Sequence, residues 1–208
     1  MGMQLSELGR ETEAKAHYEN CLRIANQIGL RAIAAISLGN LGYLERLSGR
    51  VVEGKNIYLE ALRIHQELGS TRGEAIAKAN LGEFELILDN LEQAQVYLEE
   101  SIALTDKGSS ATTGAARADL ALVFSRQGRH DDARYQLALG EEALRGVWAL
   151  EYGKLLCKRG HVEHSAGHEE AAAQALGDAR AIAEEMNAVP TSELPRAILD
   201  LAQTLGSD

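Results

Sequence analysis

The 208-residue sequence is poor in proline, cysteine and aromatic residues: it has two prolines, two cysteines and 4% Phe, Trp and Tyr. Both prolines, Pro190 and Pro195, lie near the C-terminal end, so most of the chain is free to form helices. The scarcity of aromatics predicts a core of leucine, isoleucine and alanine, which suits closely packed helices. Valine and threonine are sparse and no polar/apolar alternation persists, so no strands are expected. The sequence therefore predicts an all-α protein.

The sequence also lacks a basic patch and a long apolar run. The formal charge of −10 is spread evenly, with 10 basic and 16 acidic side chains in residues 1–106 and 11 and 15 in residues 107–208. Without a basic patch to neutralise phosphates, we expect no nucleic-acid partner. No apolar run approaches the ~20 residues of a membrane-spanning helix, and no secretory signal is visible, so we expect a cytoplasmic protein without membrane attachment. Cys21 and Cys157 are far apart in sequence and are expected to be buried, reduced thiols.

Small residues recur at a fixed interval along the chain. NLGYLERLSG at residues 40–49 returns as NLGEFELILD at residues 80–89. We call one set of these small residues the anchors: Ala14, Gly54, Ala94, Ala133 and Ala172. Each anchor lies five places after a residue expected to lie in a loop, and successive anchors are 40, 40, 39 and 39 residues apart. Twelve residues before each anchor lies another small residue: Gly2, Gly42, Gly82, Ala121 and Gly160. This regularity indicates an internal repeat.

We interpret each repeat as two helices that cross at these small residues. A missing or single-carbon side chain lets two backbones approach to roughly 8–10 Å. Each repeat closes with a residue typical of a left-handed helix end: Gly29, Gly69, Gly108, Gly146 and Asn187. The pattern predicts helices over 11–28, 31–47, 50–68, 71–88, 91–107, 111–127, 130–145, 147–166, 168–186 and 192–205. The last helix follows the candidate N-caps Thr191 and Ser192, and Pro195 falls in its first turn. Its apolar stripe predicts a lid over the end of the array: Leu194, Ile198, Leu201 and Leu205.

Asn-Leu-Gly in the first helix, followed by a small residue and then Tyr four places on in the second, resembles the tetratricopeptide repeat. The clearest matches are Asn40-Leu41-Gly42, Asn80-Leu81-Gly82 and Gly54/Tyr58/Ala61. The long period is similar to that of kinesin light chains, Pins-type spindle adaptors and bacterial regulatory members of the family. The resemblance implies a right-handed α-solenoid of antiparallel helix pairs over residues 1–187, with a C-terminal capping helix and tail over 188–208. Its first repeat would be truncated at the N-terminus, as in an excised part of a longer protein.

Two features depart from the family pattern. Arg159 stands where a leucine precedes the small residue of other repeats. The aromatic expected three places after that residue is retained in Phe124, but a glutamate replaces it in three repeats: Glu45, Glu85 and Glu163. Adjacent copies would stand about 10 Å apart, too far for a catalytic pair of acids. We expect these carboxylates to hydrogen-bond to neighbouring helices.

The resemblance implies that the first helices line a concave groove that binds a peptide or a helix. Helical spacing assigns these residues to it: Asn40, Tyr43, Arg46, Asn80, Glu83, Leu86, Asp119, Leu122, Ser125, Lys158, His161 and His164. In the family the asparagine position often bonds the main chain of a peptide, which implies that role for Asn40 and Asn80. The alternative is that both amides bond neighbouring backbone or face water. The groove is expected to combine such amides and charged groups with apolar residues that suit an amphipathic helix or an extended segment: Ile36, Ile76, Leu86 and Leu122.

The segment CKRGHVEHSAGH offers a second interpretation of part of this groove. Cys157, His161 and His164 share one face of a helix, and Cys or His ligands at such spacing can hold zinc. Against this, the Cys157 position is Gly or Ala in other repeats, and no HExxH motif occurs. A groove-lining histidine cluster is favoured over a metal site, and we expect no cofactor.

No nucleophile, base and orienting group can be assembled from the sequence, so we expect no enzyme. The favoured function is a non-catalytic interaction module, a scaffold or sensor within a larger bacterial signalling or regulatory protein, whose partner is a protein or peptide segment. The alternative is a receptor domain for a signal peptide or small ligand that regulates an attached effector. The sequence leaves the partner and the oligomeric state open.

Overall fold

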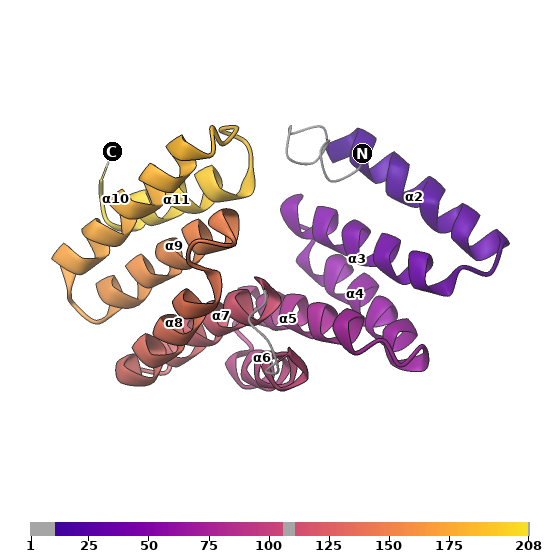
Figure 1. The fold of residues 1–208 in the computed structure, drawn as a ribbon, viewed down its shortest axis with the longest axis horizontal. Helices are drawn as coiled ribbons and strands as arrows, with labels where there is room; N and C mark the ends of the chain where they lie inside the picture. The colour runs from indigo at the N-terminus through magenta and orange to yellow at the C-terminus, as the bar shows by residue number, and fades with distance from the viewer. Residues whose placement is uncertain (1–10, 106–110, 208) are drawn as a thin grey trace. The chain divides into compact units, whose positions relative to one another are not determined.

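The computed structural model describes residues 11–105 and 111–207. These residues form helices and contain no strand (Figure 1). The helices are α2 (Glu11–Gln27), α3 (Arg31–Leu47), α4 (Val51–Glu67), α5 (Thr71–Ile87), α6 (Leu91–Thr105), α7 (Ala111–Arg126), α8 (His130–Leu144), α9 (Ala149–Ser165), α10 (Glu169–Glu185) and α11 (Glu193–Thr204). Every predicted helix is present with ends within two residues of the prediction, and the all-α fold is confirmed.

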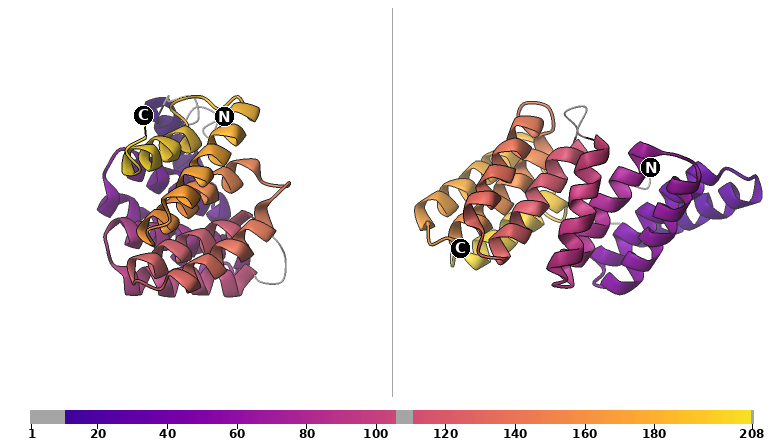
Figure 2. Two further views of the ribbon diagram at one scale, coloured as in Figure 1. Left: turned by 90° about the vertical axis from the view of Figure 1, so that its left-hand side faces the viewer. Right: turned by 90° about the horizontal axis from the view of Figure 1, so that it is seen from below.

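The chain divides into two compact units, residues 1–104 and 105–208. The first contains α2 to α6 and the second α7 to α11. In the right-hand view of Figure 2 the helices of each unit lie side by side. The short links between consecutive helices contain residues in the left-handed backbone conformation, including the predicted Gly69 (φ +63°) and Asn187 (φ +50°). The predicted helix end at Gly108 lies outside the described residues.

In the first unit the small residues lie where the paired helices touch. A Cβ atom on Gly42 of α3 would lie 2.6 Å from Cδ2 of Tyr58 and 2.9 Å from the carbonyl oxygen of Gly54 on α4. A Cβ atom on Gly54 would in turn lie 2.7 Å from the carbonyl oxygen of Gly42. The buried Tyr58 ring fills the space beside this contact and lies 5.3 Å from the Phe84 ring. The prediction that small residues mark the helix crossings is confirmed here.

In the second unit α11 covers the end of the helix array as predicted. Leu194 and Leu201 are fully buried against a cluster that includes Leu156 and Leu176. The atoms nearest to a Cβ on Gly160 belong to Leu201, so this glycine makes room for α11 rather than for its paired helix α10. Ser192 is the residue before α11, but its hydroxyl donates to the carbonyl oxygen of Val189 at 2.8 Å and does not cap the helix.

The two cysteines differ in burial. Cys157 is buried in the α9–α10–α11 cluster, whereas Cys21 is exposed, so the expectation that both thiols are buried was wrong for Cys21. Equivalent positions in later repeats are covered by the first helix of the same pair; Ser101 donates to the carbonyl oxygen of Ala75 at 2.8 Å. For α2 that partner helix would fall before Glu11, outside the described residues. Of the helices described, none is long and apolar enough to cross a membrane.

Candidate functional site

The residues predicted to line the groove lie on two surfaces, one in each unit. We call them the α3–α5 surface, with Asn40, Tyr43, Arg46, Asn80 and Glu83, and the α7–α9 surface, with Asp119, Leu122, Lys158, His161 and His164. All except Asp119 are partly exposed. Leu86 and Ser125, which the same helical spacing assigns to the groove, are buried like Asp119, with 4% and 5% of their surface exposed against 6% for Asp119.

The two asparagines of the α3–α5 surface differ in their hydrogen bonds. Asn80 donates through Nδ2 to the carbonyl oxygen of Ile76 at 2.8 Å, one turn earlier in its own helix. The Asn40 amide makes no hydrogen bond with any described residue. Ile36 and Ile76 lie one turn before Asn40 and Asn80 on the same helix faces and are 54% and 38% exposed. The surface therefore places side-chain amides beside exposed apolar side chains.

A charge pair joins the two helices of this surface. Arg46 of α3 donates through Nη1 to Oε1 of Glu83 on α5 at 3.0 Å. The Arg46 guanidinium also lies 5.1 Å from the centre of the Tyr43 ring, in range of a cation–π contact. Arg46 and Glu83 are only partly exposed, so the pair is shielded from salt more than an open surface pair would be. Three of the predicted residues thus form one connected polar group.

The α7–α9 surface is held by a closer charge pair. Lys158 of α9 lies with Nζ 2.6 Å from Oδ1 of the buried Asp119 on α7. Nε2 of His161 lies 3.2 Å from Oδ2 of Asp200 on α11. Burial lowers the pKa of His161, and Asp200 acts in the opposite direction. The charges of this surface are therefore engaged with one another and with the capping helix.

Of the three candidate zinc ligands, Cys157 is buried and the two histidines face different carboxylates. Burial raises the pKa of the Cys157 thiol to about 12, so the thiolate that zinc requires is disfavoured. Nδ1 of His164 lies 2.9 Å from Oε2 of Glu169, while His161 faces Asp200. Within residues 11–105 and 111–207, no group of three or more His, Cys, Asp or Glu side chains is arranged to hold a metal ion. The geometry gives no support to a metal site.

The recurring glutamates form the cross-helix contacts that the sequence predicted. Each lies beside a cation located one residue after the anchor of the preceding second helix: Lys15 with Glu45 at 2.7 Å, Lys55 with Glu85 at 2.8 Å and Arg134 with Glu163 at 2.8 Å. A residue five places after each glutamate adds a second contact: Arg50, Asn90 and His168. These contacts tie consecutive helix pairs together within each unit, and the prediction is confirmed.

The electrostatics of these contacts keep the carboxylates charged. Hydrogen bonds from Arg50 and then Lys15 hold the pKa of Glu45 below its ordinary value against the effect of burial. The hydrogen bonds from Arg134 lower the pKa of Glu163 in the same way. In the repeat that keeps the aromatic, the guanidinium of Arg129 lies 4.1 Å from the Phe124 ring centre, again five places on. The repeat position that carries these glutamates therefore stabilises the fold and holds no catalytic pair of acids.

Family models for the tetratricopeptide repeat match residues 33–107 and residues 1–28 of the chain. A comparison with curated proteins finds no match. The sequence evidence for the family thus lies in the first unit, apart from the last three matched residues, 105–107.

Solved structures extend the fold likeness over most of the chain. A putative kinesin light chain of Podospora anserina with nearly identical repeats is 15% identical, with a TM-score of 0.63, over 89% of this chain and 92% of that one. The Rap protein in complex with competence and sporulation factor is 12% identical, with a TM-score of 0.69, over 99% and 62%. YrrB, a tetratricopeptide protein with an unusual peptide-binding site, is 20% identical, with a TM-score of 0.51, over 87% and 82%. At these identities the likeness shows the fold alone.

Proposed function

Because this chain is a tetratricopeptide repeat protein with an all-α, helical-repeat solenoid fold, we propose that its α3–α5 surface binds a segment of another protein. The observation that carries the proposal is the Asn40 amide, which has no hydrogen-bond partner among the described residues and stands one turn from the exposed Ile36. Asn80 and Ile76 repeat the arrangement on α5. A side-chain amide both donates and accepts, as the main chain of a bound segment requires.

The proposed segment is a peptide or an amphipathic helix with apolar anchor residues. Its apolar side chains would cover Ile36 and Ile76, whose burial supplies the hydrophobic part of the affinity. The Arg46–Glu83 pair would form a polar rim beside this contact. The formal charge of −10 favours approach of a basic partner. Recognition in this form needs no cofactor and no reacting group.

The structural relatives support a peptide as the occupant. The Rap protein is known with competence and sporulation factor bound, and YrrB has a peptide-binding site. We extend this property to the present chain as part of the proposal, together with a role as a scaffold or sensor within a larger bacterial signalling protein in the cytoplasm. The proposal gives less weight to binding at the α7–α9 surface, because the charges of Asp119 and Lys158 already pair with each other. The other residues of that surface are Leu122, His161 and His164.

The proposal is tested with a peptide selected from a random library against the full chain. Replacing Asn40 and Asn80 together with alanine is expected to weaken binding of that peptide about tenfold, the loss of one or two hydrogen bonds. Alanine also favours helices, so the variant keeps its fold. Isothermal titration calorimetry measures the change in Kd.

Asn56→Ala is the matched control, because Asn56 is an exposed asparagine on α4, the second helix of its pair. It is expected to leave the Kd unchanged. Equal affinity of the double variant and the control for every selected peptide would remove the α3–α5 surface from consideration.

A further inference from the structure

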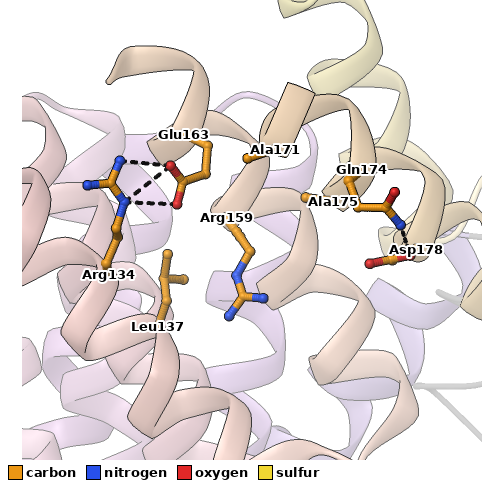
Figure 3. Close-up of a pocket in the computed structure, with 8 residues that line it drawn as sticks. All are labelled: Arg134, Leu137, Arg159, Glu163, Ala171, Gln174, Ala175 and Asp178. Carbon is orange, nitrogen blue, oxygen red and sulfur yellow. Dashed lines mark hydrogen bonds and ion pairs between the residues drawn. The ribbon is translucent and has the colours of Figure 1, made fainter. Parts of the chain in front are cut away.

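A pocket of about 380 Å³ lies in the second unit between α8, α9 and α10. Figure 3 shows the Arg159 side chain of α9 between Leu137 of α8 and Ala175 of α10. None of the residues predicted for the groove lines this pocket. Its walls carry two guanidiniums, two carboxylates and an amide, and an apolar part formed by Leu137 and two alanines. The pocket is therefore separate from the surfaces described above.

Three departures from the repeat pattern create this pocket. Arg159 replaces a leucine that is buried in the other described repeats: Leu41, Leu81 and Leu120. Ala175 stands three places after its anchor, where the other repeats carry a larger side chain: His17, Ile57, Tyr97 and Gln136. Ala171 stands just before its anchor, where the others carry Glu, Gln or Asp: Glu13, Glu53, Gln93 and Asp132. Loss of bulk on α10 and introduction of a cation on α9 thus coincide in one repeat.

The two guanidiniums of the pocket are engaged to different degrees. Arg134 makes three hydrogen bonds to Glu163, at 3.0, 3.2 and 2.8 Å. Arg159 donates through Nη2 to Glu141, and its Nε and Nη1 hydrogens have no acceptor among the residues that the structure describes. Its side chain is 29% exposed. The two edges of a guanidinium that bind a carboxylate through parallel hydrogen bonds pair Nη2 with Nε or with Nη1, and Glu141 takes only one of the two Nη2 hydrogens, so Arg159 presents one such edge open.

A carboxylate with spare acceptor capacity lies on the other side of the pocket. Oδ1 of Asp178 accepts a hydrogen bond from Nε2 of Gln174 at 2.8 Å, and Oδ2 has no partner among the described residues. Arg134 pairs with Glu163, while Arg159 and Arg145 share Glu141. Asp178 balances the third guanidinium, so the pocket has no excess positive charge that would favour a simple anion. A ligand that carries one negative and one positive group complements Arg159 and Asp178 together.

We propose that this pocket binds a free α-amino acid. The ligand's carboxylate accepts from the open edge of the Arg159 guanidinium, its ammonium group donates to Asp178, and its side chain packs against Leu137, Ala171 and Ala175. Such a ligand joins α8, α9 and α10 and stabilises the second unit by its binding free energy. The proposal makes the chain a small-ligand receptor as well as a binder of protein segments, and it does not depend on the α3–α5 surface.

The test measures the Tm of the full chain with each common L-amino acid at about 10 mM, followed by calorimetric titration of those that raise it. At least one amino acid is expected to raise the Tm and to bind with saturable heat. Its methyl ester and its N-acetyl derivative, which each lack one of the two charges, are expected to bind about tenfold more weakly or not at all. If no amino acid gives a shift or heat, or if the blocked forms bind equally well, the proposal is overturned.

Two variants follow the sequence of the other repeats and are therefore compatible with the fold. Arg159→Leu restores the common leucine, and Ala175→Gln introduces the side chain that α8 carries at the equivalent Gln136. Both are expected to keep the helical circular dichroism signal and to weaken amino-acid binding about tenfold or more. Arg180→Leu, at an exposed arginine of α10 that does not line the pocket, is the control with unchanged affinity. Unaltered binding by Arg159→Leu would also overturn the proposal.

Discussion

Replacing Gly42 with alanine is expected to lower the free energy of unfolding by about 2–3 kcal/mol, near the upper end for added volume in a packed interior. The new Cβ atom would lie 2.6 Å from the Tyr58 ring and 2.9 Å from the carbonyl oxygen of Gly54. A ring can rotate away, but the Gly54 carbonyl belongs to the α4 backbone, so α3 and α4 must separate. Urea denaturation followed by circular dichroism measures the loss as a lower midpoint.

Adding a methyl group at Gly39, three residues earlier in α3, provides the control. A Cβ atom on Gly39 would lie 3.7 Å from Cε1 of Tyr58, an ordinary van der Waals contact. Gly39→Ala is expected to raise stability by up to about 1 kcal/mol, because alanine favours the helix over glycine. If Gly42→Ala lowers the free energy of unfolding and Gly39→Ala raises it, the loss at Gly42 is due to the close contact between α3 and α4. Equal changes would mean that α3 and α4 do not approach closely at this point.

Replacing Glu85 with alanine is expected to cost about 2–3 kcal/mol. Only 2% of the Glu85 surface is exposed, and its carboxylate lies 2.8 Å from Nζ of Lys55 and accepts from Nδ2 of Asn90 at 2.9 Å. The substitution leaves both groups without their acceptor. The cost stays below that of breaking a fully buried pair, because Lys55 is 24% exposed and can reach water.

The effect of Glu85 is compared with that of a surface glutamate in the same unit. Glu60 of α4 is exposed, and Glu60→Ala is expected to change stability by less than about 0.5 kcal/mol. Glu85→Gln keeps the shape and one acceptor, so an intermediate loss is expected. Thermal or urea unfolding of the three variants measures these differences. If Glu85→Ala were as stable as Glu60→Ala, the cross-helix contacts of the repeated glutamates would contribute nothing.

The helix boundaries were predictable because residues of the same kind mark them in every repeat. Left-handed residues such as Gly69 and Asn187 end the helices, and small residues such as Gly42 fix the contacts between them. Gly160 shows the limit of this reasoning. Its place in the repeat predicts a contact with its paired helix, but the bulky Leu201 of α11 occupies the space next to it. Periodicity identifies positions that need small residues without showing which helix fills the space.

The candidate site was less predictable, because spacing along a helix does not report how far the neighbouring helix covers a face. Leu86 and Ser125 follow the groove periodicity yet are buried, and Asp119 is held by Lys158. The pocket beside Arg159 was missed, although the departure of Arg159 from the leucine pattern was visible. The small side chains of Ala171 and Ala175 also help to form this pocket. Their role could not be predicted from the sequence, because it depends on how α10 lies relative to α8 and α9.

The most direct test of the central claim, that first-helix faces bind a protein segment, is the NMR spectrum of the side-chain amides of the full chain as a selected peptide is added. The account predicts that the NH₂ resonances of Asn40 and Asn80 shift to saturation with the calorimetric Kd, while those of Asn56 on α4 stay in place. Saturable shifts at Asn56 with none at Asn40 and Asn80 would contradict it.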